Sequence, residues 1–222
     1  MKKLSIILFL LSVGLNQSFA QESSEKPIYN YADSHHEFSL DILPIINGQY
    51  PASLLYRKHY KTKNDQNAAL RFGLTLNSQF QTMEADDAQI NLTNTRGNGI
   101  GLTVGKEWQK GFTPKNMGYY GVDLGVGFSE SRTEQHFETS GSVTIQKNNN
   151  LNFSSIGFIG MKHHFSKNFS VSAESGVLAG FNQNYRNNSS KNQGNTVEDK
   201  TSTHSFSLSL MPIRALRFAF HF

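Results

Sequence analysis

After residue 36, large apolar residues alternate with small or polar ones along most of the chain, and turn-forming residues separate the alternating runs. A period of two places successive side chains on opposite faces of a β-strand. The pattern predicts eight strands and shows no competing helical periodicity. Their expected ranges are 37–45, 52–60, 68–80, 98–108, 117–131, 152–165, 169–182 and 204–222. The sequence therefore predicts an all-β protein.

The connections between these strands alternate in length. Three are long and polar, at 81–97, 132–151 and 183–203, and the connections at 61–67, 109–115 and 166–168 are shorter. Membrane β-barrels have short turns on one side and long loops on the other. The alternation is in phase with eight strands, and only the first expected external loop, near 47–51, is short. This predicts an antiparallel, up-and-down, eight-stranded transmembrane barrel.

The two faces of each predicted strand differ in composition. In the strand at 68–80, Leu70, Phe72 and Leu74 lie on one face, and Arg71 and Gly73 lie on the other. A soluble lipocalin-like barrel would bury the apolar face as a core, whereas a membrane barrel turns that face to lipid. The opposite faces carry mostly Gly, Ser and Thr instead of a Lys- and Glu-rich surface, and small residues suit the narrow interior of eight strands. We therefore favour the membrane barrel.

Isolated charges on the small-residue faces include both signs. Buried charges persist when they are paired and hydrogen-bonded. We predict that seven of them form an interior polar network, with positions at strand ends in water as the alternative: Asp41, Arg57, Arg71, Glu107, Asp123, Glu174 and Arg217.

Two further features concern individual strands. The strand at 152–165 has apolar residues of both parities, Ile156 and Phe158 against Ile159 and Met161, which suggests a bulge or a register error. Aromatic residues near the turn ends are expected in an interfacial girdle: Trp108, Tyr119, Tyr120 and Phe165.

The N-terminal residues have the three regions of an export signal. Lys2 and Lys3 precede an apolar stretch at 4–15, and Ser18-Phe19-Ala20 forms a small-x-small cleavage site. We expect a cleaved signal peptide at 1–20, with Gln21 as the first mature residue. A flexible periplasmic segment is expected at 21–36, followed by the outer-membrane β-barrel at 37–222.

The last strand ends on alternating aromatic residues. Leu216, Phe218, Phe220 and Phe222 resemble the C-terminal signal that the bacterial barrel-assembly machinery reads. The chain as a whole resembles small OmpA/OmpX-like outer-membrane β-barrels, and residues 52–57 with 69–74 are similar to the opening hairpin of Bacteroidetes-type barrels. This resemblance implies a monomer in the outer membrane of a Gram-negative cell. Its partners would be outer-membrane lipids and lipopolysaccharide, with the assembly machinery acting during biogenesis.

Candidate chemistry is sparse. The chain has no cysteine and a net charge of +4, to which the signal contributes two lysines, and no nucleic-acid footprint is visible. His164 and Ser166 have the His-x-Ser spacing of lipid A deacylase barrels, with Glu174 as a possible acid, but we expect them at a periplasmic turn. His163 and His164 point to opposite faces and cannot chelate one ion. We therefore expect no catalytic, cofactor-binding or metal-binding residues.

The expected function is a structural or surface-interaction role without catalysis, in which long external loops meet an extracellular partner. Three alternatives stay open at this point: a small-solute or hydrophobic-ligand channel, a lipid A-modifying enzyme of deacylase type, and a soluble lipocalin-like binder. Fold analogy does not choose among them, because one barrel architecture supports many activities.

Overall fold

The computed structural model of the chain describes residues 34–222, except 88–89, 138–140 and 193–194. The expected signal peptide, its cleavage site at Ala20 and Gln21, and nearly all of the 21–36 segment lie outside the described residues. The first strand begins at His36, one residue before the expected start of the barrel.

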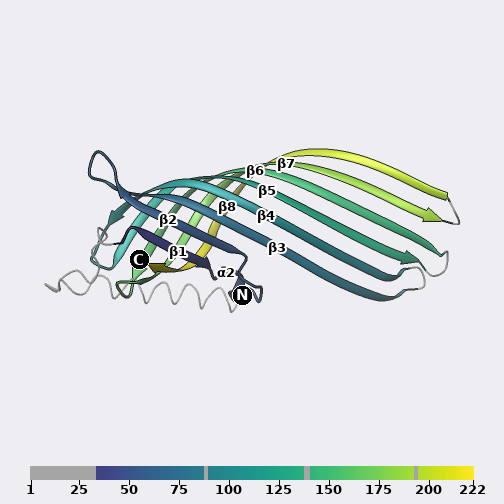
Figure 1. Cartoon of the computed structure of the whole chain (residues 1–222), viewed down its shortest axis with the longest axis horizontal. Coiled ribbons are helices and arrows are strands. Elements are labelled where there is room, and N and C mark those ends of the chain that lie inside the picture. The colour runs from purple at the N-terminus through teal and green to yellow at the C-terminus, as the bar shows by residue number, and fades with distance from the viewer. Residues whose placement is uncertain (1–33, 88–89, 138–140, 193–194) are drawn as a thin grey trace.

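Eight antiparallel strands follow one another around a closed barrel, and the first pairs with the last (Figure 1). The all-β, up-and-down fold predicted from the sequence is confirmed. Among the described residues, no helix combines the length and apolar character needed to cross a membrane. The elements are β1 (His36–Asp41), α2 (Leu43–Ile46), β2 (Ser53–Lys61), β3 (Asn67–Asp87), β4 (Ile90–Gly111), β5 (Asn116–Phe137), β6 (Ser142–His164), β7 (Phe169–Asn192) and β8 (Asn195–His221).

The ring is closed only at one end of the molecule, where the short strands β1 and β2 lie. β3 to β8 continue past this ring as a curved, six-stranded sheet (Figure 1). We call this sheet the extension, and it begins at the register line that joins Asn77, Gly99, Ser129, Asn150, Asn184 and Thr203.

The extension corrects the expected loops. Most of 81–97, 132–151 and 183–203 is strand, paired in register with its neighbours. Both faces of these segments are mainly polar, so the hydrophobic alternation that marks a strand in a sequence is lost although the backbone pairing continues. Polar side chains bond across the strands instead, as Thr82 does to Asn94 at 2.9 Å and Asn148 to Ser131 at 3.4 Å.

The first strand is also shorter than expected. It ends at Asp41 instead of residue 45, and the helical turn α2 follows. Pro44 lies in the first turn of α2, where the missing N–H costs nothing and the fixed φ favours the helix. The Asp41 carboxylate accepts the backbone N–H of Leu43 at 3.1 Å, which holds the chain as it leaves the strand.

The strands are strongly staggered around the ring. Starting at Phe72 of β3, paired residues can be followed from strand to strand in two directions around the ring. Through β4, β5, β6 and β7 they lead to Leu208 of β8. Through β2 and β1 they lead to Phe220 of β8, twelve residues further along that strand. Two of these residues come from a bulge in which Glu174 to Gly176 of β7 faces Ala215 to Met211 of β8. Such a stagger requires strands that tilt strongly against the barrel axis.

The ambiguous sixth strand contains no bulge, so that expectation was wrong. β6 keeps an unbroken register with β5 and β7. Ile156 and Phe158 point inward and are buried, whereas Ile159 and Met161 point outward with 65% and 52% exposure. Both faces look apolar in the sequence because the barrel interior has an apolar patch at this level.

Gly121 allows β4 and β5 to approach closely. A Cβ at this position would lie 2.7 Å from Cζ of Phe158 and 2.9 Å from Cα of Glu107, and it would also meet the backbone oxygen of Lys106. We expect Gly121→Ala to lower the free energy of unfolding by about 1–3 kcal/mol through overpacking. Gly157→Ala in β6 is the control, because nothing lies within 4 Å of its Cβ position. Denaturant unfolding of both variants tests this, and equal stability would contradict it.

Candidate functional site: the interior charge network

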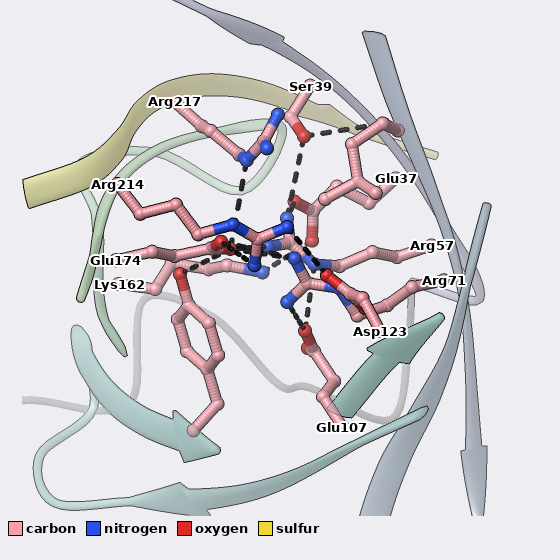
Figure 2. A network of polar contacts seen from close by, with 12 residues as sticks. Glu37, Ser39, Arg57, Arg71, Glu107, Asp123, Lys162, Glu174, Arg214 and Arg217 are labelled. Atoms are coloured by element: carbon pink, nitrogen blue, oxygen red, sulfur yellow. Dashed lines mark hydrogen bonds and ion pairs between the residues drawn. The ribbon is translucent and has the colours of Figure 1, made fainter. Parts of the chain in front are cut away.

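Five of the seven predicted residues meet in the middle of the ring. Arg57 of β2 reaches Glu107 of β4 at 3.0 Å and Glu174 of β7 at 2.8 Å. Arg71 of β3 reaches Glu107 at 2.8 Å, Asp123 of β5 at 3.1 Å and Glu174 at 3.0 Å. Figure 2 shows these head groups converging from opposite walls of the barrel. The two arginines therefore link strands on opposite sides of the ring.

Four more side chains complete what we call the interior network, and sequence reasoning missed them all. Glu37 of β1 pairs with Arg57 and with Lys162 of β6. Arg214 of β8 reaches Asp123 at 2.9 Å, and the Tyr119 hydroxyl donates to Glu174 at 3.2 Å.

The other two predicted residues lie at the margin of the network. Arg217 Nε is 3.7 Å from Glu174 Oε1, an ion pair that is too long for a hydrogen bond. The Asp41 carboxylate accepts the backbone N–H groups of Leu43 and, at 3.2 Å, of Leu216. Asp41 therefore anchors the junction of β1, α2 and β8 through backbone contacts.

The interior network is almost completely removed from solvent. Arg57, Glu37 and Glu107 are 0% exposed, and Arg71 and Asp123 are 1% exposed. The Arg71 guanidinium also lies 3.9 Å from the ring centre of Phe158, which gives the apolar patch of β6 a cationic partner. Four carboxylates face four cationic side chains within the network, and Arg217 at its margin is a fifth cation, so nearly all of the buried charge is compensated, as buried ions require.

The sequence pattern did not predict these members of the interior network, for a different reason in each case. Glu37 lies at the first position of the expected first strand, and Lys162 lies in the strand whose facing was ambiguous. Arg214 has an even number, whereas the inward residues of β8 on both sides of the bulge have odd numbers. It faces inward because it lies within the bulge between Met211 and Ala215, where the alternation is interrupted. Parity alone would have placed Lys162 inside, had Ile156 been recognised as an interior residue.

The residues of the deacylase-like motif have different surroundings. The Ser166 hydroxyl lies in the turn between β6 and β7 and accepts the backbone N–H of Phe169 at 3.1 Å. Glu174 lies in the interior network, and the His164 ring is buried 4.8 Å from the ring of His221. His163 points outward and contacts Asn116 at 2.8 Å, so the two adjacent histidines do face opposite sides.

The expected aromatic girdle needs one correction. Tyr119 is 2% exposed and points into the barrel, because it has the inward parity of Asp123. Trp108 and Tyr120 stack on the outer face at 5.6 Å, and Phe165 stacks with Phe169 at 6.3 Å near the adjoining turn. On β8, Phe218, Phe220 and Phe222 also lie on the outer face, with exposures of 42%, 43% and 51%.

The inner face of the extension has its own polar cavity. Its volume is about 430 Å³, and it is bounded by β6, β7 and β8. The side-chain oxygens of Asn150 and Asn184 in its wall are buried without a hydrogen-bond partner in the described structure. The lining residues are Asn150, Asn182, Asn184, Arg186, Asn188, Asp199, Thr201, Thr203 and Ser205.

Comparisons with protein-family models, with curated proteins and with solved structures found no match.

Proposed function

We propose that this protein is an integral β-barrel of a bacterial outer membrane, of the OmpA/OmpX-like type, with a structural and surface-interaction role. The observation that carries the proposal is the inverted distribution of side chains. Arg57 and Glu107 are 0% exposed, whereas Leu102, Leu124 and Phe72 on the outer face are 54%, 56% and 47% exposed. A water-soluble barrel would have the opposite distribution.

The exposed apolar residues form a belt with a sharp edge. Outward positions are apolar up to Leu76, Ile100, Phe128 and Leu151, and they become polar two residues further along each of these four strands. The exposed aromatic residues Phe80 and Tyr185 lie at or just beyond this edge. The first polar positions are Ser78, Asn98, Glu130 and Asn149, which are joined by one register line. A continuous belt of this kind is far larger than the apolar patches that soluble monomers tolerate, and lipid is its natural solvent.

The charged interior favours a structural role over a channel. The interior network fills the ring with paired head groups, which leaves solutes no obvious path through it. The extension, beyond the edge of the belt, would stand outside the membrane among lipopolysaccharide and extracellular partners. Its polar cavity of about 430 Å³ is the surface that we propose for those contacts.

Fractionation of expressing cells tests the location. We expect recovery in the outer-membrane fraction and an electrophoretic mobility in detergent that changes on boiling, because a closed barrel resists detergent until heated. Recovery as a soluble periplasmic protein without a mobility change would contradict the proposal and would favour the soluble lipocalin-like binder.

A further inference from the structure

Three potential metal ligands meet at the closed end of the barrel, at the margin of the interior network, which they share through Glu37. Glu37 near the start of β1, His59 near the end of β2 and His221 at the end of β8 each offer one ligand atom, and these atoms lie within 4.8 Å of one another. His59 Nε2 is 3.2 Å and His221 Nδ1 is 3.8 Å from the same Glu37 oxygen, Oε2. Two imidazoles and a carboxylate form a set that divalent transition metals favour.

The second nitrogen of each imidazole is held by a polar side chain. His59 Nδ1 lies 3.0 Å from the Gln109 amide of β4, and His221 Nε2 lies 2.7 Å from the Ser170 hydroxyl of β7. Metal-binding histidines almost always have such a partner, which fixes the ring and its tautomer. Ser170 can accept the His221 Nε2 proton directly. Gln109 Nε2 also donates to Glu107 at 2.5 Å, so a half-turn of this amide, which would let its oxygen accept the His59 Nδ1 proton, must break the Glu107 contact. Both histidines would then present a lone pair towards Glu37.

We propose that Glu37, His59 and His221 form a binding site for a divalent transition-metal ion such as Zn²⁺. Ligand atoms about 2.0–2.1 Å from tetrahedral zinc lie about 3.3 Å from one another, so small rotations of the side chains would complete the site. A fourth position is open to water or to His164, whose ring lies 4.8 Å from that of His221. This inference does not depend on the membrane location.

The charges around the site set the conditions for binding. The Lys162 ammonium contacts Glu37 Oε2, the oxygen that faces both histidines, and Arg57 pairs with the other oxygen, Oε1. Metal and Lys162 therefore compete for one oxygen. Lys162 keeps Glu37 paired in the absence of metal, so the barrel folds without a bound metal ion. When metal binds, it displaces the Lys162 ammonium towards the other carboxylates of the interior network.

Titration of the full-length, chelator-treated protein in detergent with Zn²⁺ tests the proposal. We expect one site per chain, a loss of affinity of at least tenfold in His59→Ala and in His221→Ala, and a loss of about 10–100-fold in Gln109→Ala. His59 is the primary test position because its side chain is 12% exposed, so truncation is better tolerated there than at Glu37.

His163→Ala is the matched control, because His163 lies on the outer face of β6 and contacts Asn116. It should bind Zn²⁺ as the wild type does, and the circular dichroism of every variant should retain the β-sheet spectrum. Absence of saturable binding to the folded wild type would overturn the proposal. Equal affinities in the wild type, His59→Ala and His221→Ala would overturn it as well.

Discussion

Replacing Glu174 with leucine is expected to lower the free energy of unfolding by about 3–5 kcal/mol, the usual cost of removing one partner from a buried ion pair. Glu174 accepts hydrogen bonds from Arg57, Arg71, Tyr119 and Arg214. Without its carboxylate, the three arginines would stay in a ring where water cannot replace the lost partner. The substitution therefore leaves uncompensated charge instead of merely deleting one contact.

Urea unfolding of the refolded protein in lipid vesicles, followed by the fluorescence of Trp108, measures this effect. Glu198→Leu is the control, because Glu198 forms an ion pair with Lys200 at 3.5 Å in the extension and both side chains are more than half exposed. Exposed pairs contribute about 0–1 kcal/mol. Similar destabilisation by the two substitutions would mean that the interior network does not hold the barrel together.

Replacing Leu124 with arginine is expected to lower the free energy of unfolding in a bilayer by about 2–4 kcal/mol, the cost of a cation at the midplane on the lipid face of a barrel. Leu124 lies on the outer face of β5, midway between Tyr120 and Phe128, and is 56% exposed. If the apolar belt faces lipid, the guanidinium must lose its hydration or distort the bilayer around it.

Glu130→Arg is the matched control on the same strand and face, six residues away and beyond the edge of the belt. Near an interface the cost falls to about 0–1 kcal/mol. A soluble barrel predicts a different outcome, because an arginine on a water-exposed face is tolerated. Equal stabilities of the two variants in vesicles would therefore argue against a lipid-facing belt.

The ring and the extension differ in how polar and apolar side chains are distributed over the two faces of their strands. In the ring, apolar residues face out and charged residues face in, so the strands are amphipathic. In the extension both faces are mainly polar, and cross-strand hydrogen bonds between Asn, Ser and Thr side chains accompany the backbone ladder. This division suits a protein whose ring is held by lipid and whose extension meets water and partners.

Period-two alternation determined the strand number, the antiparallel order and the facing of residues such as Arg71 and Phe72, because alternation is local and reads directly from the chain. It also located five members of the interior network without assigning their pairs. Period-two alternation does not predict strands or their facing where the two faces of a strand have similar polarity. The sequence pattern therefore predicts loops where the extension lies, and it does not show that Ile156, Phe158 and Lys162 face inward.

Tertiary structure alone decided which charges meet and what they can bind. Glu37, His59 and His221 are far apart in sequence, and they come together only because β8 closes on β1 with a stagger of twelve residues. Arg214 points inward only because of the bulge in β8. Register and closure depend on the whole ring, so the sequence by itself determined the faces of the strands, and the folded barrel determined the partners across it.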